Sequence, residues 1–109
     1  MSDPAPILRD AMLLHTWVLQ GFEAQRHPTA AHVCRLSTRL LDAVLLALHD
    51  RDRGARLADA DDALLCLRMH LRVAGERRQC SEDGMWHALR LCDDVGRQIG
   101  GWQRSLTRP

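Results

Sequence analysis

The stretch from Ser81 to Leu106, SEDGMWHALRLCDDVGRQIGGWQRSL, decides the fold class of this chain. Its apolar residues recur at alternating steps of three and four, the spacing of an amphipathic helix that faces a bundle core. Ser81 is the expected N-cap, and the acidic pair after it suits the positive end of the helix dipole. The apolar residues are Met85, Ala88, Cys92, Val95, Ile99, Trp102 and Leu106.

Two helices are expected in the first half of the chain. The first covers residues 3–26, with Asp3 as its N-cap before a proline. It ends at His27, because the residue before a proline is pushed out of the helical region. The second covers residues 30–51, with Thr29 as its N-cap.

A third helix is expected from Asp59, its N-cap, to about Arg78. The preceding stretch 52–58 contains a glycine and several charges without an apolar period, which predicts a loop. The pair 61–62 would place aspartates in the first turn, and the pair 77–78 would place arginines in the last.

Each of these three helices also has an apolar stripe at helical spacing, and the short connections between them favour antiparallel neighbours. We therefore predict one all-α domain over residues 1–109, an antiparallel up-down-up-down four-helix bundle. The stripe residues are Ile7, Ala11, Leu14, Val18 and Phe22; Val33, Leu36, Leu40, Val44 and Leu48; Ala60, Ala63, Leu67, Leu71 and Ala74.

The charge balance is close to neutral, with a formal net charge of +1. This argues against a strongly basic nucleic-acid binder, so any such binding needs a local patch. All fifteen basic residues are arginine, which fits either GC-rich codon usage or the use of planar guanidinium groups to hold phosphate.

The apolar runs are too short for a membrane span, and the acidic, proline-containing N-terminus does not resemble a signal peptide. We therefore expect a cytoplasmic protein that does not bind membranes. Its four widely spaced cysteines are expected to be reduced thiols.

Several large apolar side chains fall outside the core stripes when residues are placed at about 100° per position. Leu13 and Trp17 lie one turn apart on the first helix, and Leu65, Met69 and Val73 form a line on the third. Exposed apolar stripes favour association, and most soluble oligomers contain identical subunits. We therefore expect a homo-oligomer with these five residues in its interface.

No catalytic or cofactor motif is recognisable in the sequence. The Glu-x-x-His pairs of di-iron bundles are missing. Cys66 and His70 lie one turn apart, but two ligands without a second pair do not make a zinc site. The pair 61–62 is explained by helix-start electrostatics and the pair 93–94 by a solvated face. We assign no catalytic residue, metal or cofactor and expect no enzymatic activity.

Arg68 and Arg72 are the most informative polar pair, because they lie one turn apart beside the apolar line of the third helix. Such a pair could grip phosphates of a nucleic acid. It could equally pair with nearby carboxylates at helical spacing or with a neighbouring subunit.

Two segments carry a family resemblance: ADADDALLCLRMHLRVAG at 58–75 and VGRQIGGW at 95–102. They resemble the accessory variability protein of diversity-generating retroelements and the related four-helix proteins encoded in ribosomal-RNA intervening sequences. The resemblance implies a homopentamer that partners a reverse transcriptase and its template RNA. The arginines that it assigns to partner binding match Arg68 and Arg72, and Trp102 matches a structural position.

The near-neutral charge departs from the markedly basic retroelement protein. The expectation is accordingly a homo-oligomeric accessory or binding protein, with RNA or a nucleic-acid enzyme such as a reverse transcriptase as its partner. The alternative is a protein-interaction scaffold without a nucleic-acid role.

Overall fold

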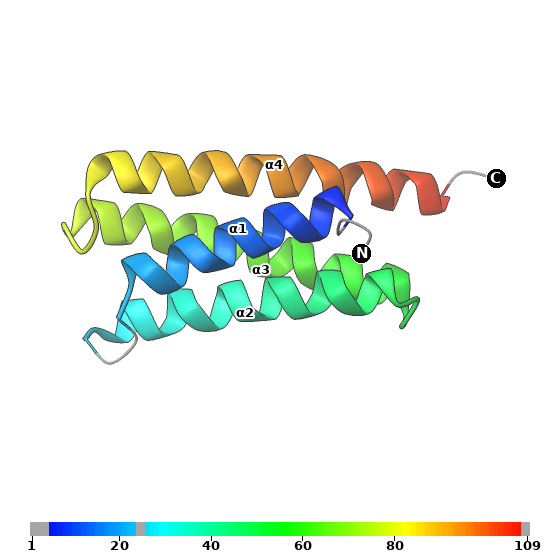
Figure 1. Ribbon diagram of the computed structural model, residues 1–109, viewed down its shortest axis with the longest axis horizontal. Helices are drawn as coiled ribbons and strands as arrows, with labels where there is room; N and C mark the ends of the chain where they lie inside the picture. Colours follow the sequence, from blue (N-terminus) through cyan, green and yellow to red (C-terminus); the bar gives the residue numbers. More distant parts are fainter. Residues whose placement is uncertain (1–4, 24–25, 108–109) are drawn as a thin grey trace.

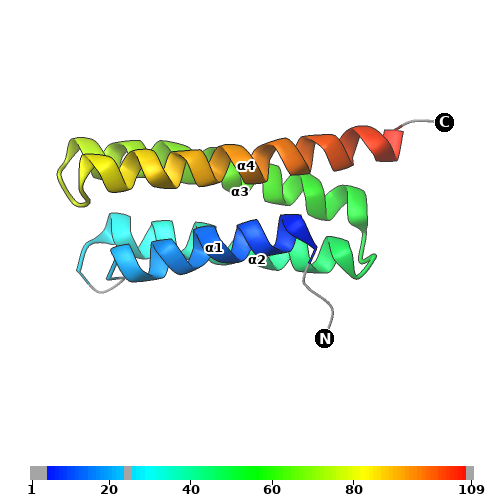
Figure 2. The ribbon, with the colours of Figure 1, turned by 45° about the horizontal axis from the view of Figure 1, so that its top comes forward.

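Four α-helices form the protein in a computed structural model that describes residues 5–23 and 26–107. They are α1 (Pro6–Gly21), α2 (Pro28–Leu48), α3 (Arg53–Glu76) and α4 (Glu82–Thr107). Successive helices run in opposite directions (Figure 1), and α1 and α2 form one layer against α3 and α4 (Figure 2). The predicted all-α four-helix bundle is confirmed.

The core lies where the four predicted stripes meet. Each helix packs against two neighbours, in the pairs α1·α2, α2·α3, α3·α4 and α1·α4. The helices α1 and α3 therefore occupy diagonal corners. Nearly all of the stripe residues are buried. The exceptions lie toward helix ends: Leu48, Met85 and Trp102 are half-buried against the core, and Leu106 is exposed.

The bounds of α1 differ from the prediction. Asp3 lies outside the described residues, and the helix begins at Pro6 after Ala5. It ends at Gly21 and does not continue to residue 26, because Phe22 adopts an extended backbone with φ −128° and ψ 119°. This turn in the backbone accompanies burial of the Phe22 ring in the core.

The start of α2 also differs. His27 is the N-cap and Pro28 occupies the first turn, so the prediction of Thr29 as N-cap was wrong. A proline at this position stabilises the start because it lacks the amide hydrogen that would otherwise be unpaired there. The helix ends at Leu48, shortly before its predicted end.

The loop predicted at 52–58 was wrong, because α3 already begins at Arg53. Asp50 and Asp52 adopt positive φ values of 58° and 51°, so the chain reverses within a short connection. Leu57 then anchors the start of α3 by being fully buried. Asp59 is consequently inside the helix and is not an N-cap, and the pair 61–62 lies beyond the first turn.

The start of α4 was predicted correctly. Ser81 Oγ accepts a hydrogen bond of 3.0 Å from the backbone N–H of Gly84, as an N-cap does. The helix continues without a break through the glycine pair at 100–101. Within residues 5–23 and 26–107, no helix combines the length and apolarity needed to cross a membrane.

Candidate partner-binding surfaces

The apolar line predicted on α3 lies on the surface. We call Leu65, Met69 and Val73 the α3 ridge; their exposed fractions range from 40% to 64%. They recur at every fourth position, so they follow one side of the helix. Trp86 on α4 is also exposed. A protein surface of this kind is suited to a partner because its side chains are large, apolar and adjacent.

Trp17 was predicted to lie outside the core stripe, but its ring is half-buried against the core. Its ring packs edge-on to Phe22 at 6.1 Å and at a tilt to His87 at 6.2 Å, measured between ring centroids. Gly84 at the start of α4 leaves room for it, since a Cβ there would lie 3.1 Å from the Trp17 ring. The indole is thus largely occupied within its own chain, and its role in an interface stays a prediction.

A second exposed apolar surface lies on α1. Met12, Leu13 and Leu19, which we call the α1 face, have exposed fractions between 47% and 54%. Only Leu13 among them was predicted from the sequence. A signal was present, because residues 11–22 contain no Asp, Glu, Lys or Arg. Surface helices usually carry charged residues on the side that faces solvent, and this stretch has none over three turns.

Arg68 is held by α4. It forms an ion pair with Asp93 and donates a 3.2 Å hydrogen bond from Nη2 to the backbone carbonyl of Cys92. Gly96 provides the space, since a Cβ there would lie 2.8 Å from the guanidinium. Asp93 is solvent-exposed, as the solvated-face interpretation of the 93–94 pair predicted, and it also pairs with Arg68. Its neighbour Asp94 pairs with Arg97 along α4.

Arg72 has a different environment. Its side chain is exposed, and its guanidinium carbon lies 6.0 Å from the ring centroid of Trp86. This distance is at the outer limit of a cation–π interaction. Arg68 and Arg72 therefore flank the α3 ridge as predicted, but Arg68 fastens α3 to α4 while Arg72 remains at the surface beside an aromatic ring.

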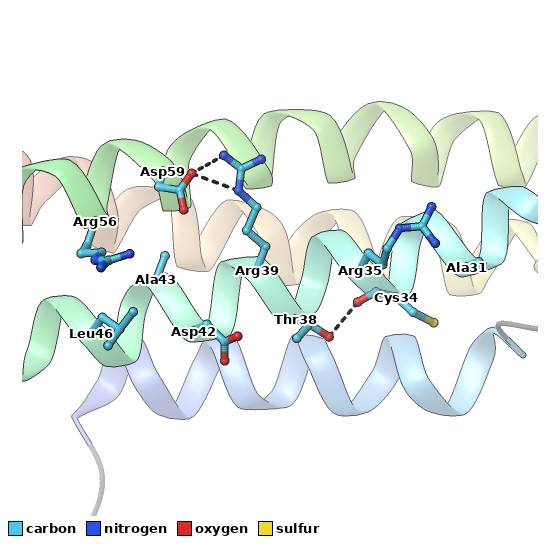
Figure 3. Close-up of a pocket in the computed structure, with 10 residues that line it drawn as sticks. All are labelled: Ala31, Cys34, Arg35, Thr38, Arg39, Asp42, Ala43, Leu46, Arg56 and Asp59. Carbon is cyan, nitrogen blue, oxygen red and sulfur yellow. Dashed lines mark hydrogen bonds and ion pairs between the residues drawn. The ribbon is translucent and has the colours of Figure 1, made fainter.

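A groove of about 500 Å³ runs between α2 and α3 (Figure 3). Arg39 spans it and donates a 3.0 Å hydrogen bond from Nε to Asp59, which lowers the pKa of that carboxyl group below its ordinary value. Arg35 and Arg56 also line the groove, and the Arg56 Nε is buried without a hydrogen-bond partner among the described residues. Sequence reasoning missed this groove because it depends on the register of two helices.

The potential metal ligands remain scattered. The ring centroids of His32 on α2 and His70 on α3 lie 4.5 Å apart, and Cys66 is exposed. Burial, together with His70 and Arg35, lowers the pKa of His32. Within the described ranges, no three His, Cys, Asp or Glu side chains gather as a metal site would require. All four cysteines are free thiols, and burial raises the pKa of Cys92 to about 12.

A family model described as bAvd-like matches residues 12–106, which include nearly all of the bundle. The chain belongs to the bAvd-like family. This confirms the predicted family, and the match extends well beyond the two segments that carried the resemblance. No curated protein and no solved structure matches the chain. The membership identifies this bAvd-like chain as an accessory protein of the Avd type.

Proposed function

We propose that this bAvd-like protein is a non-enzymatic, cytoplasmic accessory subunit that self-associates, as a pentamer by the family resemblance, and binds RNA or a reverse transcriptase. The observation that carries the proposal is the α3 ridge with Arg72 at its edge. This surface combines apolar area for a protein contact with a guanidinium for an anionic partner.

Self-association is supported by the size of the exposed apolar side chains. Burying a Leu, Met or Val side chain completely stabilises by roughly 1.5 to 3 kcal/mol. The ridge residues are about half exposed, so covering them would contribute on the order of 1 kcal/mol each. The α1 face offers a similar amount. Together these surfaces can offset part of the entropy lost on association.

Nucleic-acid binding is supported by the chemistry around Arg72. A guanidinium can hold a phosphate, and the neighbouring Trp86 ring can stack on an unpaired base. Arg68 lies one turn before Arg72, and its guanidinium is already paired with Asp93 of α4. It can contact a phosphate only if it shares Asp93 with the phosphate or leaves this ion pair. The contribution of Arg72 is therefore expected to be the larger of the two.

The test is fluorescence anisotropy with labelled single-stranded and structured RNA across a salt series. We expect binding that weakens with salt, and a salt dependence that falls by about one phosphate contact in Arg72→Ala. Arg104→Ala on α4 is the matched control, because it removes the same charge from an exposed site away from the ridge. The proposal fails if RNA shows no salt-sensitive binding at low ionic strength and the Arg68→Ala/Arg72→Ala double variant changes nothing.

A scaffold without a nucleic-acid role is the second candidate. The ion pair of Arg68 with Asp93 and the net charge of +1 favour it, because both reduce the positive charge available for phosphates. It predicts that a specific protein copurifies with the tagged chain after nuclease treatment. Loss of all bound protein on nuclease treatment would contradict this candidate.

A further inference from the structure

The groove between α2 and α3, which we call the α2–α3 groove, takes no part in the function proposed above and shares no residue with the α3 ridge (Figure 3). Its volume of about 500 Å³ lies in the range of sites that bind small organic molecules. The charged side chains that line it are three arginines and two aspartates: Arg35, Arg39, Arg56, Asp42 and Asp59. The charges and the volume together make the groove a candidate site for a small anionic molecule.

The ion pairs within the described residues leave two of these arginines without a carboxylate partner. Arg39 pairs with Asp59 across the groove, whereas Arg35 and Arg56 belong to none of those ion pairs. Arg35 Nη2 lies 3.4 Å from the Nδ1 atom of His32, and Arg56 Nε is buried without a hydrogen-bond partner. The Arg56 side chain can therefore turn toward an anion without breaking a described hydrogen bond.

The two unpaired arginines lie toward opposite ends of the groove, with Arg39 between them (Figure 3). Arg35 belongs to α2 and Arg56 to α3, and these helices run in opposite directions (Figure 1). Since Arg39 faces Asp59, Arg56 lies level with about residue 42 of α2. Along the helix axis, Arg35 and Arg56 are therefore about 10 Å apart. A molecule that contacts both must carry two separate anionic groups.

The middle of the groove offers hydrogen-bond acceptors. Asp42 is exposed and forms no ion pair with another described residue, and its carboxylate can only accept hydrogen bonds. Thr38 Oγ1 donates its hydrogen to the backbone carbonyl of Cys34 at 2.9 Å, so this oxygen is also left as an acceptor. Between its anionic ends, the molecule should therefore carry hydroxyl groups that donate hydrogen bonds.

We propose that the α2–α3 groove binds a small organic bisphosphate that has a phosphate group at each end and hydroxyl groups between them. Arg35 holds one phosphate, Arg56 holds the other, and Asp42 accepts hydrogen bonds from the hydroxyl groups. Phosphate fits better than carboxylate because a monoester carries a charge of about −1.5 to −2 and offers three acceptor oxygens. Sugar bisphosphates have this chemistry. The proposal goes beyond the proposed function and does not depend on RNA binding, because the groove and the α3 ridge are separate.

Isothermal titration calorimetry of the wild-type protein at low ionic strength tests the two-ended recognition. The first probe is fructose 1,6-bisphosphate, which has phosphates at both ends of a hydroxylated carbon chain. Fructose 6-phosphate lacks one of these phosphates. Pyrophosphate keeps two phosphoryl groups but joins them directly, so it is too short to reach both arginines. We expect fructose 1,6-bisphosphate to bind roughly tenfold more tightly than either of the other probes, because only it contacts both guanidinium groups.

Two variants locate the phosphates. Arg35→Gln and Arg56→Gln each remove one guanidinium, and each should weaken the binding of fructose 1,6-bisphosphate about tenfold. Each should weaken fructose 6-phosphate by only about twofold, because its single phosphate can use the arginine that remains. Arg104→Gln is the matched control and should change neither affinity. It removes the same charge from an exposed site on α4, which does not pack against α2.

The proposal is overturned if fructose 1,6-bisphosphate does not bind at millimolar concentration or if pyrophosphate binds equally tightly. It is also overturned if Arg104→Gln weakens binding as much as Arg35→Gln does, because the arginine-rich surface would then attract anions without a defined site. Circular dichroism melts check that the variants fold. The comparison of the three probes on the wild type needs no substitution, so it decides the proposal even if a variant fails to fold.

Discussion

Arg68 and Arg72 show how far residue spacing alone determines a site. Their one-turn separation correctly places both beside the α3 ridge. The partner of Arg68, however, comes from α4, and Gly96 makes the room for it. That contact depends on the register between two helices, which a stripe pattern does not specify. The sequence therefore predicts the location of the pair but not that only Arg72 remains exposed at the surface.

The buried Cys92 thiol makes a residue-scale prediction about pH. Burial raises its pKa from 9.0 to about 12. Above pH 9 the unfolded chain loses this proton and the folded chain keeps it, so the free energy of unfolding falls as pH rises from about 9 to 12. The loss is up to about 1.4 kcal/mol per pH unit from this group. Urea unfolding from pH 8 to 10.5 measures it.

Cys92→Ala is the reference for this thiol. The variant is less stable at pH 8 because it leaves a cavity, but its stability should fall less steeply above pH 9 than that of the wild type. The half-buried Cys34 and Cys80 shift in the same direction and remain in both proteins, so the comparison isolates Cys92. Equal slopes in the two proteins would show that Cys92 ionises normally in the fold.

At the scale of the element, the sequence predicts helix faces better than helix ends. The stripes were correct because burial follows the 3.6-residue period wherever four helices share a core. The ends depend on local backbone geometry and on tertiary anchors. Leu57, fully buried, extends α3 through a stretch that resembles a loop, and the extended Phe22 ends α1 early. Asp59 has the residue type of a cap but instead binds Arg39 across the α2–α3 groove.

Two substitutions, each of which removes a side-chain hydroxyl, test whether a residue with a typical capping side chain is in fact the N-cap of its helix. Ser81→Ala removes the hydrogen bond to the Gly84 amide and should lower the free energy of unfolding by about 1 kcal/mol. Thr29→Ala should change it by less than about 0.5 kcal/mol, because His27 is the N-cap of α2 and Thr29 follows the proline. Urea titrations followed by circular dichroism measure both. Similar losses in the two variants would contradict the assigned caps.

At the scale of the whole molecule, the candidate surfaces depend on which helices are diagonal. The sequence indicated the ridge and Leu13, but it placed Trp17 with them, although Trp17 packs against α4. It also gave no indication of the α2–α3 groove. The helical period shows on which side of its own helix a residue lies. Which neighbouring helix packs against that side is known only from the assembled bundle. The α1 face and the α3 ridge remain uncovered because of this arrangement of the four helices.

Linkage between association and folding gives a prediction for the intact protein. If copies cover these apolar surfaces, the midpoint of thermal unfolding rises with protein concentration, because association stabilises only folded chains. Each tenfold increase contributes up to about 1.4 kcal/mol per chain, or several degrees for a domain of this size. Circular dichroism melts between 1 and 100 µM measure the shift. Met69→Asp should remove the concentration dependence, whereas Leu106→Asp should retain it, since Leu106 lies outside both surfaces. A wild-type midpoint that stays constant over this range would contradict self-association.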